Sequence, residues 1–200
     1  MPRNSKVDAE ITRQRIVSSA LSRASVDGLG GLTIGTLSAS LGLSKAGVVG
    51  PFGSKADLQA ATLEAALDRF FGDIVAPCAD AQPGLARLNR LLDRWVDYIV
   101  ASPFPNGCFL TAASCELDGQ PGPLRDRLAE AVTAWRVLLV DQIEIAQVTG
   151  DVSPEVDATD AVIVLSGLAM AANQEIELLD DDPPTTGARA RRLMRAALRL

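Results

Sequence analysis

The 200-residue chain contains no histidine. This absence excludes Ser-His-Asp and Cys-His catalysis and every metal site that needs an imidazole ligand. The chain also lacks a phosphate-binding loop of the GxxxxGKS or GxxxxGKT type and a GxGxxG motif after a strand. The glycines at 28, 30 and 31 precede Thr33 and indicate a turn. Acidic groups at 175, 177 and 180–182 are interpreted as solvated charge, with acid–base chemistry or cation binding as the alternative. We therefore expect neither enzymatic activity nor a cofactor.

Cysteines are few, and long apolar runs are missing. Cys78, Cys108 and Cys115 form neither a close metal-type cluster nor an even disulfide set, so reduced thiols are expected. We interpret Cys108 and Cys115 as packing residues, with a thiol-reactive sensor as the alternative. No run of 18 apolar residues and no signal-peptide pattern occurs, which predicts a soluble, cytoplasmic protein. A hydrophobic content of 48% is enough for a sizeable core.

The segment from Thr33 to Leu58 has the pattern of a helix-turn-helix. Apolar residues at 34, 37 and 41 share one helical face, and Gly42 lies where the chain must turn. Ser44 is placed to cap the next helix, which in such a unit can enter a DNA major groove. The alternative interpretation is an ordinary helical hairpin within a bundle.

The block from Thr12 to Leu58 resembles the N-terminal domain of the tetracycline-repressor-like (TetR) family of bacterial transcriptional regulators. Residues 107–126, GCFLTAASCELDGQPGPLRD, resemble one branch of that family, and the remainder resembles it only in helical layout. The resemblance implies an all-α fold, with a three-helix DNA-binding domain over residues 1–53 and a helical ligand-binding and dimerisation domain over residues 54–200. The matching anchors are Ile16, Ala20, Gly28, Thr33, Gly42, Ser44, Lys45, Phe52 and Lys55.

Helical periodicity and turn residues predict about nine helices and almost no strand. Asp27-Gly28 is expected to end the first helix, and Ser54 to cap the fourth. Besides the helix-turn-helix pair, the predicted helices cover residues 8–26, 54–76, 83–102, 109–117, 123–149, 157–179 and 185–200.

The net charge of −6 is unevenly distributed. Residues 1–60 carry seven basic and four acidic side chains, whereas the other 140 residues carry 12 basic and 21 acidic ones. The basic part coincides with the helix-turn-helix, as a phosphate-facing surface requires. By resemblance, the DNA-contacting residues are Thr33, Ser44, Lys45, Ala46, Gly47, Val49 and Lys55.

The recognition segment departs from the family at Val49-Gly50-Pro51, where the family usually has an aromatic followed by polar residues. Proline removes a backbone donor and glycine is a poor helix former, so the recognition helix is expected to end about one turn early. Base reading by alanine, glycine and valine supplies few hydrogen bonds, which favours shape readout or weak affinity.

Both tryptophans and the single tyrosine lie in the larger predicted domain. Core packing is the simplest role for these side chains. The resemblance implies a cavity for a small, mostly apolar effector. The predicted effector-binding residues are Trp95, Tyr98, Phe104, Cys108, Phe109, Ala112, Trp135 and Leu139.

Residues 157–200 resemble the two C-terminal helices through which the family dimerises. The residues expected at that interface are Ala158, Ala161, Val162, Leu165, Leu168, Ala169 and Ala172. A buried core helix is the competing interpretation.

Together these features predict a ligand-responsive, homodimeric repressor that binds a palindromic operator in double-stranded DNA and has no membrane partner. The alternative is a small-molecule-binding or interaction protein whose helix-turn-helix binds DNA weakly. The Val49-Gly50-Pro51 segment favours this alternative.

Overall fold

The computed structural model describes residues 2–200, with side chains described from Lys6 onward. This part of the chain is all-helical, with nine α-helices, one short 3-10 helix and no strand, as the sequence predicts. The helices form two compact units. Unit 1 runs up to Arg69 and includes Phe109–Leu128, whereas unit 2 consists of Phe70–Cys108 and Ala129–Leu200. The functional division expected at residue 53 stays a prediction.

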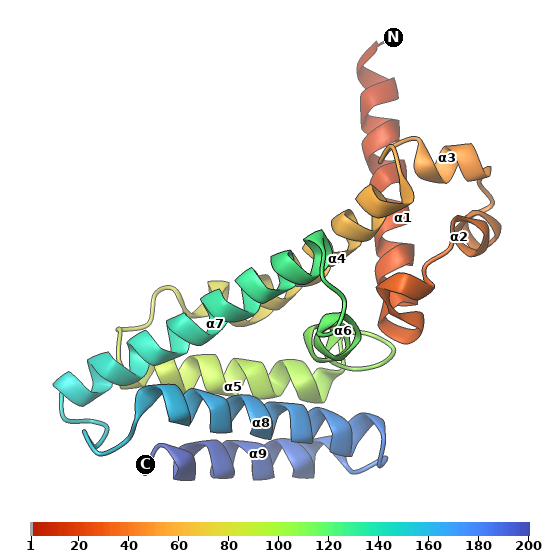
Figure 1. The fold of residues 1–200 in the computed structure, drawn as a ribbon. Coiled ribbons are helices and arrows are strands. Elements are labelled where there is room, and N and C mark those ends of the chain that lie inside the picture. Colours follow the sequence, from red (N-terminus) through yellow and green to blue (C-terminus); the bar gives the residue numbers. More distant parts are fainter. Residues whose placement is uncertain (1) are drawn as a thin grey trace. The chain divides into compact units, whose positions relative to one another are not determined.

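Unit 1 contains the helices of the expected DNA reader, α1 (Pro2–Gly31), α2 (Ile34–Leu41) and α3 (Lys45–Val49) (Figure 1). The predicted start of the first helix at Asp8 is wrong. Proline is tolerated in the first turn of a helix, and no residue breaks the helix until Gly28. Gly28 has a φ of 77°, which interrupts α1 where the sequence predicts its end, and one further turn leads to Gly31.

Side-chain caps define where the next helices begin. The Thr33 hydroxyl accepts a hydrogen bond from the Thr36 N–H at 3.1 Å, and the Ser44 hydroxyl accepts one from the Gly47 N–H at 3.0 Å. Gly42 adopts the left-handed conformation that ends α2, with a φ of 66°. Ser54 accepts from the Asp57 N–H at 3.1 Å at the start of α4 (Lys55–Ile74). These caps confirm the predicted helix starts.

Unit 2 is built around α5 (Leu85–Ala101), α8 (Ala158–Glu177) and α9 (Pro183–Ala197), which pack against one another (Figure 1). A 3-10 turn, η1 (Ala76–Cys78), precedes α5. The other helices are α6 (Phe109–Leu117) in unit 1 and α7 (Pro123–Val148), which contributes to both units. All these helices lie within a few residues of their predicted bounds.

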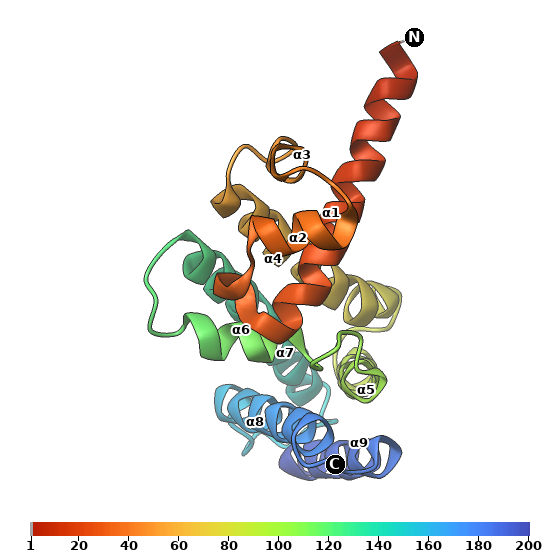
Figure 2. The same ribbon diagram turned by 90° about the vertical axis from the view of Figure 1, so that its right-hand side faces the viewer.

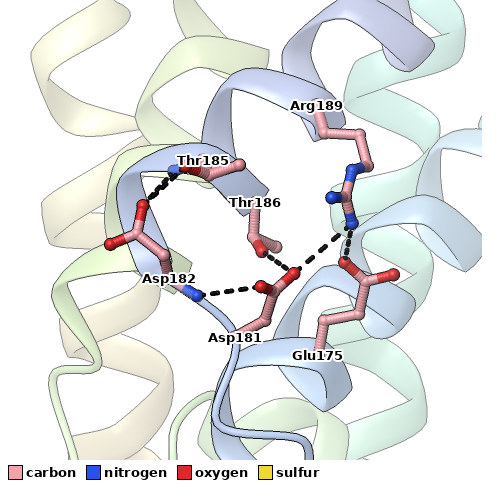
Figure 3. A network of polar contacts seen from close by, with 6 residues as sticks. All are labelled: Glu175, Asp181, Asp182, Thr185, Thr186 and Arg189. Carbon is pink, nitrogen blue, oxygen red and sulfur yellow. Dashed lines mark hydrogen bonds and ion pairs between the residues drawn. The ribbon is translucent and has the colours of Figure 1, made fainter.

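The corner between α8 and α9 is held by acidic side chains (Figure 3). Asp182 caps α9 by accepting from the Thr185 N–H at 3.0 Å and from its hydroxyl at 2.6 Å. Asp181 accepts from the Thr186 hydroxyl at 3.0 Å, and Arg189 joins Glu175 at 2.6 Å. Asp180 and Asp182 are exposed, as expected of solvated charge, and Asp182 in addition caps the first turn of α9.

Candidate functional site

The residues predicted to contact DNA lie on the outward side of the reader. Thr33, Ser44, Lys45, Ala46 and Lys55 are exposed, and Gly47 and Val49 are half-buried. Val48 points the other way and is fully buried at 0% exposure. Helices α2 and α3 pack against each other as one helix-turn-helix (Figure 2), and Lys55 lies at the start of α4. Their contact with DNA stays a prediction.

The recognition helix α3 is short, as Pro51 predicts. It ends at Val49, and Gly50 closes it through a 2.8 Å hydrogen bond from its N–H to the Ala46 carbonyl. The following turn is held from α1, where the Arg13 guanidinium lies 5.0 Å from the centre of the Phe52 ring. This cation–π contact anchors the chain after the helix ends.

The turn before α2 is held from two other helices. The Leu29 and Gly30 N–H groups donate to the two carboxylate oxygens of Glu116 on α6, at 2.8 and 2.7 Å. The carbonyls of the same two residues are bound from α4, since the Leu29 carbonyl accepts from Gln59 Nε2 at 2.6 Å and the Gly30 carbonyl accepts from Lys55 Nζ at 3.4 Å. No sequence signal indicated these contacts of Glu116 and Gln59.

Aromatic rings form a cluster inside unit 2. Trp135 packs edge-to-face with Trp95 at a centroid distance of 5.1 Å and with Phe70 at 5.4 Å. Phe70 also meets Tyr98 edge-on at 5.6 Å. The Trp135 indole Nε1–H is buried and has no hydrogen-bond partner among the described residues. An unpaired buried donor is costly, so an acceptor brought by a ligand would relieve that cost.

The other predicted effector residues are also in the interior. Phe104, Cys108, Phe109 and Leu139 are buried, and Ala112 is half-buried. Phe109 and Ala112 belong to unit 1, whereas the other six predicted residues belong to unit 2. The structure thus brings Trp95, Tyr98 and Trp135 together in one cluster with Phe70, which is not among the predicted effector residues. Effector binding by these residues stays a prediction.

The three cysteines differ in exposure. Cys78 and Cys108 are buried, and Cys115 is exposed, so packing accounts for the first two only. Burial raises the pKa of the Cys78 thiol, with nearby arginine charges opposing the rise. No group of three or more acidic or cysteine side chains in the described chain is arranged to hold a metal ion.

Helix α8 presents two different faces. Five of the seven side chains predicted at the dimer interface, including Ala161, Leu165 and Ala169, are buried within the single chain, whereas Ala158 and Leu168 are half-buried. The competing interpretation, a core helix, is therefore correct for the five buried side chains, and the dimer itself stays a prediction. The opposite face is exposed and apolar, with Ile163 at 53% and Met170 at 45% exposure. Beside α8 lies a groove of about 430 Å³ lined by Thr133, Arg136, Val137, Val140, Thr159 and Val162.

No helix in the described part of the chain combines the length and the apolar character needed to cross a bilayer.

Several solved structures share this fold. A TetR transcriptional regulator from Chloroflexus aurantiacus superimposes with a TM-score of 0.84 at 23% identity, over 94% of each chain. A TetR transcription regulator from Haloarcula marismortui gives a TM-score of 0.74 at 25% identity, over 94% of this chain and 97% of that one. AibR, solved with isovaleryl coenzyme A and operator DNA, gives 0.75 at 14% identity, over 91% of this chain and 97% of that one.

A search of curated proteins found no match to the sequence. The sequence profile of the tetracyclin repressor-like C-terminal domain matches residues 84–194, which is more than half of the chain. The chain therefore belongs to the tetracycline-repressor-like (TetR) family of transcriptional regulators.

Proposed function

We propose that this protein is a ligand-responsive repressor that binds a palindromic operator as a homodimer and is released by a small, mostly apolar effector. The observation that carries the proposal is the outward-facing reader. Its predicted contact residues are exposed or half-buried, whereas Val48 between them is fully buried. The charge of residues 1–60 is positive although the whole chain is acidic. An acidic remainder limits unspecific binding to DNA.

Selection of duplexes from a random library by the purified protein tests the DNA part. We expect an enriched palindromic motif and an affinity that falls steeply with salt, because binding releases counterions. Lys45→Ala should weaken DNA binding. It should also reduce the slope of log affinity against log salt concentration by about one unit for each phosphate that the variant no longer neutralises. Lys45 is a cleaner probe than Lys55, whose ammonium group also contacts the Gly30 carbonyl. Arg192→Ala, an exposed arginine of unit 2, is the matched control for charge.

The exposed face of α8 supports the homodimer. Gly167 lies on this face between Ile163 and Met170, and a Cβ added to it would meet nothing within 4 Å in its own chain. Glycine inside a helix costs up to about 1 kcal/mol relative to alanine. A partner helix approaching closely at this point would explain why a small residue stands there. A homodimer with two-fold symmetry can also place one DNA-binding unit on each half of a palindromic operator.

The aromatic cluster supports an apolar effector with a hydrogen-bond acceptor. The unpaired Trp135 Nε1–H would donate to that acceptor, and the surrounding rings would cover the apolar part. AibR shows that one protein with this fold holds an acyl coenzyme A and operator DNA in one crystal structure. Tryptophan fluorescence during a screen of apolar compounds should reveal binders. Trp135→Phe should weaken the binding of compounds that carry a hydrogen-bond acceptor more than the binding of compounds that lack one.

The shortness of α3 favours a second candidate function, a small-molecule-binding or interaction protein that has lost specific DNA reading. If selection enriches no motif while apolar compounds still bind, this second function replaces the first.

A further inference from the structure

The turn between Gly28 and Thr33 is capped by a side chain from a different helix. Because α1 breaks at Gly28, the N–H groups of Leu29 and Gly30 begin a new helical turn and have no partner within it. A carboxylate from another helix satisfies both, since Glu116 accepts from Leu29 at 2.8 Å and from Gly30 at 2.7 Å. Hydrogen bonds to an ionised acceptor are about twice as strong as neutral ones.

The chain around the turn is shaped to admit this carboxylate. A Cβ on Gly28 would lie 2.8 Å from Glu116 Oε2, and a Cβ on Gly30 would lie 3.2 Å from Oε1. Gly28 also has a φ of 77°, which side-chain-bearing residues rarely adopt. Glycine at position 28 therefore serves both the break in α1 and the close approach of Glu116.

The turn leads directly into the reader. Leu29 and Leu32 are anchored in the core, with exposures of 0% and 1%, and Thr33 then caps α2. Since α2 packs against both α1 and α3, a fixed turn holds the start of the α2–α3 pair in place beside α1.

We propose that Glu116 is a positioning residue for DNA binding, which fixes the helix-turn-helix by capping the turn at Leu29 and Gly30. The inference rests on the proposed function in so far as the reader binds DNA. Glu116 acts through the turn and needs no contact with DNA itself.

Hydrogen exchange of the DNA-free protein tests the positioning directly. Glu116→Gln keeps the shape of the side chain but removes its charge and one of its two acceptor oxygens, and Glu116→Asp keeps the charge but shortens the reach. Both variants should exchange about tenfold faster than wild type in peptides covering residues 28–41, the effect of losing one charge-assisted hydrogen bond. Peptides from α9 should be unchanged. Asp118→Asn, an exposed carboxylate just after α6, is the matched control and should behave like wild type.

DNA binding by the full chain supplies the second measurement, with the duplex that wild type selects and a scrambled duplex of equal length as probes. Glu116→Gln should bind the selected duplex about tenfold more weakly and the scrambled duplex as well as wild type does, because unspecific binding depends on phosphate charge. Equal losses on both duplexes, or affinities equal to those of Asp118→Asn, would overturn the proposal. Unchanged exchange over residues 28–41 in both Glu116 variants would overturn it as well. Failure of wild type to select any motif rejects the proposed function instead, and the exchange result still decides whether Glu116 positions the turn.

Discussion

Pro51 determines the length of the helix that is expected to read DNA. It follows Gly50, which is already in a right-handed helical conformation with φ and ψ of −47° and −45°. The chain could therefore continue as a helix if position 51 supplied a backbone N–H. Pro51→Ala should lengthen α3, which an increase in helical circular dichroism and protection of the new amide would measure.

Val49 occupies the position where the family commonly has an aromatic residue, and it is half-buried at the end of α3. We expect Val49→Tyr to strengthen DNA binding, because a tyrosine hydroxyl can donate to a phosphate. One added hydrogen bond corresponds to about a threefold to tenfold gain in affinity, measurable by fluorescence anisotropy. Val49→Phe lacks the hydroxyl and is the control. Weaker binding by a folded Val49→Tyr variant would mean that valine itself contacts a base.

Local sequence signals predicted the caps, whereas the contacts of Glu116 could not be predicted. Thr33 and Ser44 bond to N–H groups three residues ahead, so the information lies within one helical turn. Glu116 reaches N–H groups 87 and 86 positions earlier in the chain. Its only sequence signal is its place within residues 107–126, which resemble one family branch but do not indicate a contact.

At the scale of elements, α9 approaches α5 closely at Gly187. A Cβ at this position would lie 2.6 Å from Val100 Cγ2 and 3.4 Å from Val96 Cγ1. Glycine to alanine inside a helix normally stabilises by up to about 1 kcal/mol, but overpacking against stiff β-branched side chains costs about 1–3 kcal/mol. Gly187→Ala should therefore lower the free energy of unfolding in urea.

Gly72 in α4 is the control for this prediction. It also lies within a helix, but a Cβ added there would meet nothing within 4 Å. Gly72→Ala should leave stability unchanged or raise it by up to about 1 kcal/mol. A gain of stability in Gly187→Ala would show that α5 and α9 pack less tightly than the structure indicates.

The cap of α9 makes the stability of that helix depend on pH. Hydrogen bonds from the Thr185 hydroxyl and backbone N–H lower the pKa of Asp182 below its ordinary value of 3.8. A lowered carboxyl pKa contributes stability above the unfolded value, and this contribution is lost as pH falls through the folded one. Wild type should thus melt at a higher temperature than Asp182→Ala at pH 7, and the difference should shrink below about pH 4.

Serine at position 182 provides the control. Asp182→Ser retains a capping oxygen without a titrating group, so its melting temperature relative to Asp182→Ala should not depend on pH. The same pH dependence in Asp182→Ser would assign the acid effect to another carboxylate.

At the scale of the whole molecule, the two faces of α8 allow folding and the proposed dimerisation to be tested separately. Leu165 has an exposure of 0% within one chain, whereas Ile163 is 53% exposed. Leu165→Glu should unfold the protein, because it buries an uncompensated charge. Ile163→Glu should leave the circular dichroism spectrum intact and convert a dimer into a monomer in sedimentation. A wild-type monomer at micromolar concentration would refute the homodimer.

All the strongly fluorescent side chains belong to one of the two compact units. Trp95, Trp135 and Tyr98 lie in unit 2, and unit 1 contains neither tryptophan nor tyrosine. Intrinsic ultraviolet emission therefore reports on unit 2 and does not detect unfolding confined to unit 1. With the two indole rings edge-to-face at 5.1 Å, both tryptophans report on the same place in unit 2. In a variant with Trp95→Phe and Trp135→Phe, a single tryptophan introduced into α2 or α3 would be the only source of indole fluorescence. Its emission would then report on unit 1.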